Sequence, residues 1–254
     1  MRILEETGAD NILDIGCGSG RTVLDVFEMN RRVHGIEPVE PLLAVAQELL
    51  SANGHDPNVV EKGDIQGLSK LEADSFNTVS VLSVLPHIER AEWDAAHRNI
   101  ARLLRAGGYF IASYRNDLFD LYTFNSFTID FIVNSLWNCD ILDALRTDDT
   151  IKSLKKLIQN PDVPGSSYTC APDKNFGTLT RVNSNPLEMS SYLAGFGLEL
   201  KKTYFFNYHC VPPLLSDSIK DYRLLSHRMN LEMSEDWRGN FEASTFVVLA
   251  QKSE

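Results

Sequence analysis

A glycine-rich segment near the start of the chain could bind a nucleotide-like ligand through its backbone. It reads DIGCGSG over residues 14–20, directly after a short apolar run. Glycines allow positive φ and a close approach of backbone N–H groups to a ligand, and the N-terminus of a following helix adds partial positive charge. The segment lacks the third glycine of a dinucleotide fingerprint, where Arg21 stands, and it lacks the lysine of a P-loop. Asp14 would repel a phosphate, so the segment favours a ligand with ammonium or sulfonium groups over a pyrophosphate.

Further polar residues follow other apolar runs. Glu37 ends a run at residues 33–37, Asp64 lies in a Gly-Asp-Ile segment, and His87 follows a run at 76–82. In an open parallel sheet such run ends meet at the carboxyl edge, where these folds bind ligands. The sequence therefore predicts one edge that gathers the glycine-rich segment, two acids and a histidine.

The elements that would position these residues alternate between strands and helices from residue 11 to residue 114. Apolar and β-branched runs predict strands at 12–15, 33–37, 59–61, 76–82 and 109–114. Helical spacing of apolar residues predicts helices at 21–30, 41–53 and 93–104. This alternation indicates an α/β fold, a parallel sheet with helices on both faces.

The pattern changes after Arg115. Residues 116–186 predict two or three aromatic-rich helices and a loop, and the sheet pattern resumes with a helix at 187–195 and strands at 198–206 and 244–251. We expect residues 1–115 and 187–254 to form the core. Residues 116–186 are expected to form an inserted helical cap over the carboxyl edge of the sheet. Residues 207–243 form a second excursion before the last strand.

These motifs, in this order, resemble the class I S-adenosylmethionine-dependent methyltransferases. The resemblance covers residues 11–114 and, more loosely, the last strand. It rests on five segments: ILDIGCGSG (12–20), Glu37, GDI (63–65), the run 76–81 with LPHI (85–88), and LRAGG (104–108). It implies a seven-stranded Rossmann-like methyltransferase sheet whose last strand is antiparallel, with the mainly helical cap inserted.

The resemblance also implies where the cofactor S-adenosyl-L-methionine and its product S-adenosyl-L-homocysteine would bind. Glu37 would take both ribose hydroxyls, Asp64 would accept from the adenine amino group, and Asp14 would lie near the cationic part. The full expected set of cofactor-binding residues is Asp14, Gly16, Cys17, Gly18, Gly20, Glu37, Pro38, Asp64, Ile65 and Ser83. Members of the family commonly carry a helical cover before the first strand; here either the start is truncated or residues 116–186 supply the lid.

Methyl transfer needs an acceptor with a free lone pair, aligned with the methyl group in a site that excludes water. A hydroxyl acceptor benefits from a general base. His87 and His209 are the candidate bases, each with the alternative of a structural histidine. Tyr114 and Arg115 are expected to follow the fifth strand and face the acceptor, Arg115 either holding a carboxylate or phosphate or forming a salt bridge.

Other polar residues are weaker candidates. Arg181 and Asn185 could hold an anionic acceptor group with less positional support. The remaining histidines are expected to be peripheral: His34, His55, His97 and His227.

Composition narrows the partners and the compartment. The 254 residues include 35 Asp and Glu against 24 Lys and Arg, a formal net charge of −11, which disfavours nucleic acid and anionic membrane surfaces. No apolar run approaches the roughly 20 residues of a membrane span. The four cysteines lie far apart and no metal ligands cluster, which predicts reduced thiols, no metal site and, with an acidic N-terminus, a cytoplasmic protein.

The sequence therefore predicts a methyltransferase that acts on an oxygen or nitrogen of a small molecule, such as a sugar or a secondary metabolite, with a homodimer as a candidate assembly. Three alternatives stay open. A protein or tRNA methyltransferase is disfavoured by the segment SVLPH (83–87), which lacks an acceptor motif of the N/D-P-P type. A binding protein that has lost catalysis would retain the cofactor site without turnover. A spermidine-synthase-like transfer would need paired acids after the fourth strand, which the sequence lacks.

Overall fold

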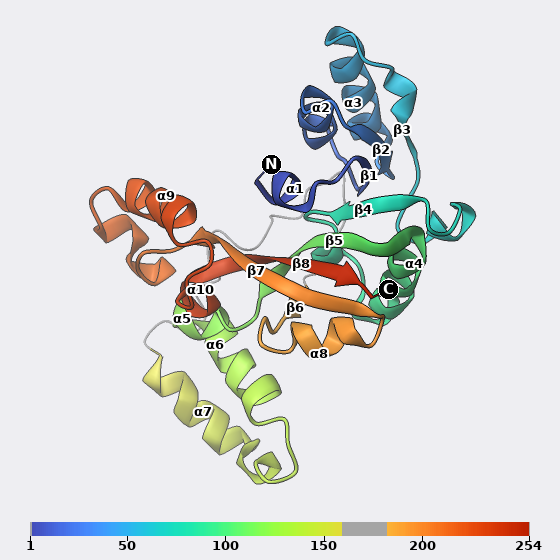
Figure 1. Cartoon of the computed structure of the whole chain (residues 1–254). Coiled ribbons are helices and arrows are strands. Elements are labelled where there is room, and N and C mark those ends of the chain that lie inside the picture. Colours follow the sequence, from blue (N-terminus) through green and yellow to red (C-terminus); the bar gives the residue numbers. More distant parts are fainter. Residues whose placement is uncertain (1, 159–181, 254) are drawn as a thin grey trace.

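The computed structural model describes residues 2–158 and 182–253, and a single twisted sheet organises them (Figure 1). Its strands are β1 (Asn11–Ile15), β2 (Arg32–Glu37), β3 (Val60–Lys62), β4 (Phe76–Val81), β5 (Leu104–Asn116), β6 (Asn183–Ser184), β7 (Leu198–Tyr208) and β8 (Ala243–Lys252). The strand order is β3-β2-β1-β4-β5-β8-β7, and β8 runs antiparallel to both of its neighbours. The predicted α/β fold with an antiparallel last strand is confirmed.

The helices are α1 (Arg2–Thr7), α2 (Arg21–Glu28), α3 (Glu40–Ala52), α4 (Trp93–Leu103), α5 (Asp120–Thr123), α6 (Ser126–Phe131), α7 (Asp148–Leu157), α8 (Met189–Ala194), α9 (Tyr222–Glu232) and α10 (Gly239–Glu242). Four helices lie where the sequence predicts them, α2, α3, α4 and α8, and the segment after β5 is helical as well, whereas α1, α9 and α10 were not predicted. None of these helices is both long and apolar enough to cross a membrane, within the part of the chain that the structure describes.

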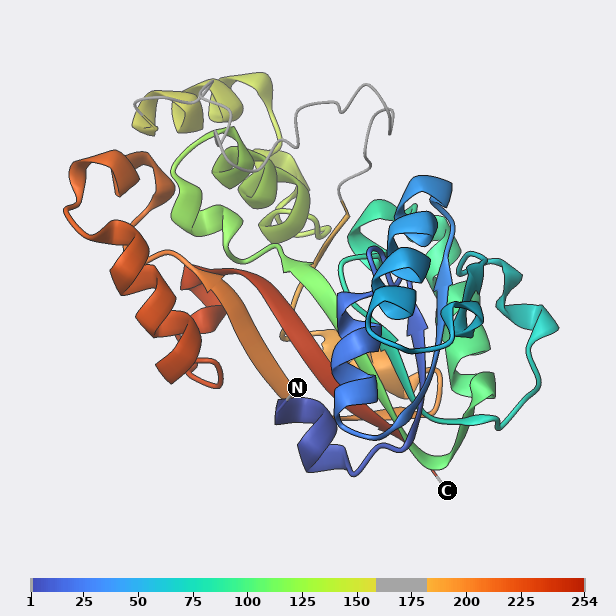
Figure 2. The same cartoon turned by 90° about the horizontal axis from the view of Figure 1, so that it is seen from above.

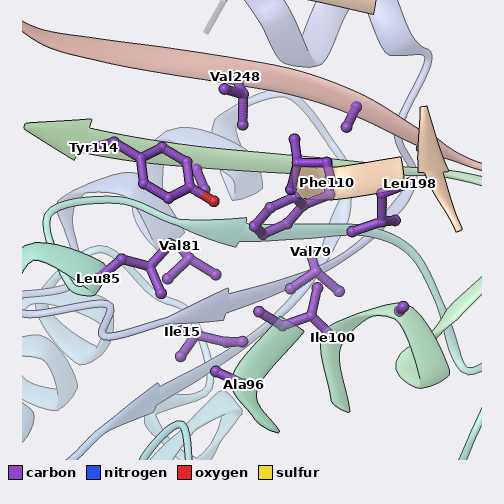
Figure 3. Packing of buried hydrophobic residues seen from close by; sticks show 14 of the residues in the cluster. Ile15, Val79, Val81, Leu85, Ala96, Ile100, Phe110, Tyr114, Leu198 and Val248 are labelled. Atoms are coloured by element: carbon purple, nitrogen blue, oxygen red, sulfur yellow. The ribbon is translucent and has the colours of Figure 1, made fainter. Parts of the chain in front are cut away.

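Two apolar layers enclose the sheet. One layer packs buried residues of α4 and α8 against one face, and the other packs α2 and α3 against the opposite face near β1 and β2. Alternate residues of β5 serve the two layers: Phe110, Ala112 and Tyr114 join the α4 side, whereas Ile111 joins the other. Figure 3 shows Phe110 and Tyr114 projecting from β5 into the first of these layers, among Val79, Ile100 and Leu198.

The short strand β6 is an eighth strand that the predicted seven-stranded sheet does not include. It pairs in parallel with the end of β5, Arg115 opposite Asn183 and Asn116 opposite Ser184. Because β8 occupies the other side of β5, β6 continues the line of β4 beyond the point where β4 ends. The Val182 N–H also donates to the Pro86 carbonyl at 3.1 Å, which joins β6 to the segment that follows β4.

The residues after β5 are helical, as the sequence predicts for the first part of the cap. Figure 2 shows α5, α6 and α7 beyond the carboxyl end of β5. Asn125 caps α6 and Thr147 caps α7 with side-chain oxygens that accept from backbone N–H groups. The limits of the cap at residues 116 and 186 stay a prediction, and most of the predicted loop lies outside the described residues.

The second excursion, residues 207–243, is tied to the end of β5 by one buried amide. The Asn116 Nδ2 donates to the carbonyls of Gly239, Asn240 and Ala243 at 3.2, 2.8 and 2.8 Å. This anchor fixes α10 and the start of β8 beside the carboxyl end of β5.

Candidate cofactor and active site

The glycine-rich segment forms a tight turn between β1 and α2. Gly16, Gly18 and Gly20 all have positive φ, at 72°, 57° and 79°. A Cβ on Gly16 would lie 2.3 Å from the Val84 Cγ2, and a Cβ on Gly20 would lie 2.9 Å from that of Ala46. Nothing lies within 4 Å of the corresponding point on Gly18. Gly16 and Gly20 therefore pack against neighbouring elements, whereas Gly18 leaves space for a ligand to approach the backbone.

Glu37, the last residue of β2, holds this turn in place. Its side chain is 4% exposed. One carboxylate oxygen accepts from the Gly18 N–H at 2.8 Å, and the other accepts from the Val39 N–H at 2.9 Å. A carboxylate oxygen has two lone pairs, so each retains one for a further donor. Two ribose hydroxyls are donors of the required kind.

Asp14 lies beneath the same turn and is buried. The Ser80 hydroxyl donates to its carboxylate at 2.5 Å, across the pairing of β1 with β4. Burial raises the pKa of Asp14 to about 6, against the hydrogen bond from Ser80, and the nearby charge of Glu37 raises it further. Burial and the same two acids raise the pKa of Cys17 to about 12. This concentration of negative charge is suited to a cationic ligand.

Asp64 marks the expected adenine end of the site. It is exposed, and its Oδ1 accepts from the N–H groups of Gln66 and Gly67 at 3.0 and 2.7 Å. A hollow of about 200 Å³ opens beside it, lined also by Ile36 and Leu68. Ile65, however, is buried in the core. Its predicted cofactor contact stays a prediction.

The remaining expected cofactor residues lie at the same edge. Pro38 is exposed directly after Glu37. Ser83 follows β4, is exposed, and has a φ of 61°. Its N–H donates to the Ser113 hydroxyl at 2.6 Å, which holds this strained residue against β5.

His87 and Arg115 are the charged candidates at the ends of β4 and β5. His87 ends a short 3-10 turn, Leu85–His87, and is exposed. Partial burial of the ring lowers the pKa of His87, and the charge of Arg115 lowers it further. The two side chains therefore interact electrostatically, and His87 is favoured in the neutral form that can accept a proton.

The prediction that Tyr114 faces the acceptor is wrong. Tyr114 lies within β5 and is fully buried, stacked on Phe246 at 5.4 Å between ring centroids. Its hydroxyl pairs with the His97 Nε2 at 2.8 Å, and the His97 Nδ1 pairs with the Trp93 carbonyl at 2.7 Å. Side chains alternate between the two faces of a strand, so Tyr114 lies on the same face of β5 as Phe110 and points toward α4 (Figure 3).

His97 is therefore not peripheral, as its place in the sequence had indicated. It is fully buried beside the rings of Trp93 and Tyr114, and burial lowers its pKa to about 4. The other three histidines fit the expectation better. His34 contacts Glu61 at 3.1 Å, His55 stacks on Phe27, and His227 is exposed.

His209 lies at the carboxyl end of β7, in the half of the sheet away from the glycine-rich turn. The strands β5 and β8 separate β7 from β4, so the structure does not bring His209 beside His87. The Tyr222 hydroxyl contacts its Nδ1 at 2.5 Å, and Phe119 packs on its ring at 4.9 Å between centroids. Burial lowers the pKa of His209 to about 4. It lines a separate pocket of about 720 Å³ with Tyr222 and Asp221.

Several residues of this edge were not identified from the sequence. Ser80 and Ser113 contact Asp14 and Ser83 across strand pairs, and only the register of the strands reveals them. Asn185, a weaker candidate, lies beside β6, and its Oδ1 accepts from the Leu187 N–H. Arg181 and Cys170 lie outside the described residues; Cys17, Cys139 and Cys210 are free thiols.

Comparison with known proteins relates part of the chain to methyltransferases. Residues 12–108 match a family model described as a methyltransferase domain. An uncharacterized methyltransferase of Anoxybacillus flavithermus is 30% identical over 109 residues, which are 43% of this chain and 48% of the relative. A tRNA N(3)-methylcytidine methyltransferase of Schizosaccharomyces pombe is 24% identical over 113 residues, 42% of this chain and 37% of that protein. The chain thus spans less than half the length of these relatives.

Solved structures extend the likeness in fold to the whole chain. A SAM-dependent methyltransferase of Methanosarcina mazei superposes with a TM-score of 0.58 over all of this chain and 98% of its own, at 15% identity. The strand order and the glycine-rich turn at the carboxyl edge are those of a Rossmann-like fold. Residues 12–108 are thus similar to a methyltransferase domain, and the whole chain is similar in fold to a solved SAM-dependent methyltransferase.

Proposed function

We propose that this protein transfers a methyl group to an oxygen or nitrogen of a small molecule. The observation that carries the proposal is the pairing of Glu37 with an open Gly18, which leaves two carboxylate lone pairs and an unobstructed backbone at the carboxyl edge. Glu37 would hold the ribose, Asp64 the adenine, and buried Asp14 the cationic end. When bound there, S-adenosylmethionine supplies an electrophilic methyl group on a sulfonium.

The acceptor side of the site would lie between the ends of β4 and β5. The side chains available there are His87, which is favoured in its neutral form, and Arg115, whose charge acts on it. His87 would take the proton that a hydroxyl acceptor loses as its oxygen bonds to the methyl carbon. Arg115 would hold an anionic group of the acceptor through its planar guanidinium. Methyl transfer requires the acceptor atom to approach the methyl carbon in line with the carbon–sulfur bond that breaks. The main contribution of these residues would therefore be to align the acceptor with that bond.

Two features support a small acceptor. The helices α5 to α7 stand beyond the end of β5 (Figure 2), where they would cover a bound acceptor. The formal net charge of −11 also disfavours a polyanionic substrate. Two alternatives remain. A tRNA or protein substrate is one, and the relative named as a tRNA methyltransferase favours tRNA; a cofactor-binding protein without catalysis is the second.

One experiment separates the three. The full chain is incubated with S-adenosylmethionine carrying an isotopically labelled methyl group, together with a small-molecule extract, bulk tRNA or protein in separate reactions. We expect label to enter only the small-molecule fraction, and the loss of that label in Glu37→Ala but not in Glu40→Ala. Label in tRNA or protein would replace the small-molecule proposal, and bound cofactor without any transfer would indicate a binding protein.

A further inference from the structure

A second pocket opens on the α4 and α8 side of the sheet, next to β6. It has a volume of about 570 Å³ and is lined by Arg90, Asp117, Ser184, Asn185, Glu188 and Tyr192, among others. Its lining includes Asn185, a weaker candidate for holding the acceptor, and none of the residues expected to bind the cofactor or expected to act in catalysis. The pocket is therefore distinct from the glycine-rich turn, although the bond from Val182 to Pro86 brings its rim close to the segment after β4.

Two polar atoms of this pocket are buried and have no hydrogen-bond partner in the described chain. They are the Asp117 Oδ1 and the Ser184 hydroxyl. Ser184 is 6% exposed, and its carbonyl is already occupied by the Asp117 N–H at 3.1 Å. A buried acceptor without a donor costs about 1–3 kcal/mol. Two such atoms beside one cavity indicate that a donor from a ligand belongs there.

The charge around the pocket is predominantly negative. Burial raises the pKa of Asp117 to about 6, and the neighbouring charges of Asp120 and Glu188 raise it further. Backbone hydrogen bonds from Leu118 and from Asp117 itself act the other way and lower this pKa. Arg90 is the positive residue of the lining; its guanidinium lies over the rings of Trp93 and Tyr192, 4.4 and 4.8 Å from their centroids. The site therefore combines a carboxylate that keeps one oxygen without a partner with an aromatic wall.

A metal ion does not fit this arrangement. The described residues contain no group of three His, Cys, Asp or Glu side chains that could ligate one. The Asp120 carboxylate, whose charge acts on Asp117, is engaged as well, because its Oδ2 accepts from the Asn183 amide at 2.8 Å. An ammonium group instead offers three N–H donors without a fixed coordination geometry. The Asp117 Oδ1, the Ser184 hydroxyl and the Glu188 carboxylate are three acceptors for it.

We propose that this pocket binds the ammonium group of a small organic amine, with Asp117 and Ser184 as its buried acceptors and Tyr192 as the wall beside its apolar part. The site stands on its own lining residues and does not depend on the proposed methyl transfer. The amine is either the methyl acceptor or a separate ligand, and the same chemistry would recognise both.

Benzylamine and benzyl alcohol are the matched probes, because they share a shape and differ in charge. Titration calorimetry with the full chain at pH 8 should show one benzylamine bound and no binding of benzyl alcohol. Asp117→Asn and Ser184→Ala should each weaken benzylamine by at least tenfold. Glu199→Gln, an exposed acid at the start of β7, should leave it unchanged. Affinity should also fall by about tenfold from pH 7.5 to pH 5, as Asp117 takes up a proton beside Asp120, Glu188 and Arg90.

Two further measurements serve as controls. Unchanged affinity of Asp117→Asn for S-adenosylhomocysteine shows that the variant is folded and that the cofactor site is intact. Mass spectrometry after incubation with S-adenosylmethionine shows whether the bound amine is methylated, which assigns it as acceptor, or unchanged, which assigns it as a separate ligand. The proposal is overturned if benzylamine does not bind, if benzyl alcohol binds equally, or if the two pocket variants bind as the wild type does.

Discussion

Replacing Asp14 with asparagine should stabilise the ligand-free protein and weaken its cofactor binding at the same time. Asparagine keeps an oxygen that can accept from the Ser80 hydroxyl, so the substitution removes the buried charge and little else. The charge is costly because the carboxylate is 4% exposed and lies near Glu37. A ligand that carries positive charge would offset that cost.

The magnitude follows from the pKa. Burial raises the pKa of Asp14 from 3.8 to about 6, and each unit is worth about 1.4 kcal/mol, so the ionised side chain costs about 3 kcal/mol in the folded state. An acid with a raised pKa binds its proton more tightly when folded. The wild type therefore loses this stability as the pH rises from about 4 to about 6, and the loss stays constant above that.

The assay is urea unfolding of Asp14→Asn and wild type at pH 4.5 and pH 8. The free energy of unfolding of the variant, relative to that of the wild type, should increase by about 2 kcal/mol from pH 4.5 to pH 8. Any effect of the substitution that does not depend on pH cancels in this comparison. Asp25→Asn, an exposed carboxylate on α2, controls for the change of net charge. The affinity for S-adenosylhomocysteine at pH 8 should fall by at least tenfold. A stability difference that does not change with pH would refute the buried charge, and unchanged affinity would refute its role toward the ligand.

Three other substitutions separate structural from functional residues. Gly16→Ala should lose at least about 2 kcal/mol of stability, since its Cβ would meet Val84 at a positive φ. Gly18→Ala should lose only about 1 kcal/mol of stability but most of the affinity for the cofactor. Equal stability losses of the two variants in thermal unfolding would contradict this contrast. Tyr114→Phe should cost about 1 kcal/mol through the lost bond to His97 and leave the methyl-transfer rate within a few-fold, so a large rate loss would restore a catalytic role. His87→Ala should lower the rate of methyl transfer to a hydroxyl acceptor by about 100-fold. The wild-type rate should rise with pH through a midpoint below 6.5, because the pKa of His87 is lowered. Activity of His87→Ala within a few-fold of the wild type would reject His87 as the general base.

Much of the sheet could be predicted because its strands are apolar runs bounded by turns. The strand ends at Ile15 and Glu37 agree with the prediction, since each meets a polar or glycine turn. β6 could not be predicted, because Asn183 and Ser184 carry no apolar pattern and form a strand only by pairing with β5. The extension of β5 to Asn116 depends on that pairing as well.

The orientation of Tyr114 was out of reach for a related reason. From Phe110 to Tyr114 β5 is buried at every position, so the sequence there shows no alternation that would tell which face each residue takes. His97, in contrast, could have been found. It follows Trp93 by four residues on the same helix, a spacing that places both on the buried face.

The positions of the residues expected to bind the cofactor were more predictable than those of the residues expected to face the acceptor. Glu37 and Gly18 meet because their place at strand ends determines their position, and that place is readable from the motifs. Asp14 was placed correctly at the end of β1, but its partner Ser80 depends on the register between β1 and β4. Asp117 and Ser184 meet only through β6, which no pattern in the sequence indicates.

The binding of S-adenosylhomocysteine to Glu37→Ala, measured by calorimetry beside the wild type and Glu40→Ala, tests the central claim most directly. Glu40 is an exposed acid three residues further on, paired with Lys62, so its removal changes the charge without touching the turn. We expect the wild type and Glu40→Ala to bind one molecule with equal affinity and Glu37→Ala to lose at least about 30-fold, which is about 2 kcal/mol. Equal affinity in all three proteins would contradict the assignment of this edge as the cofactor site.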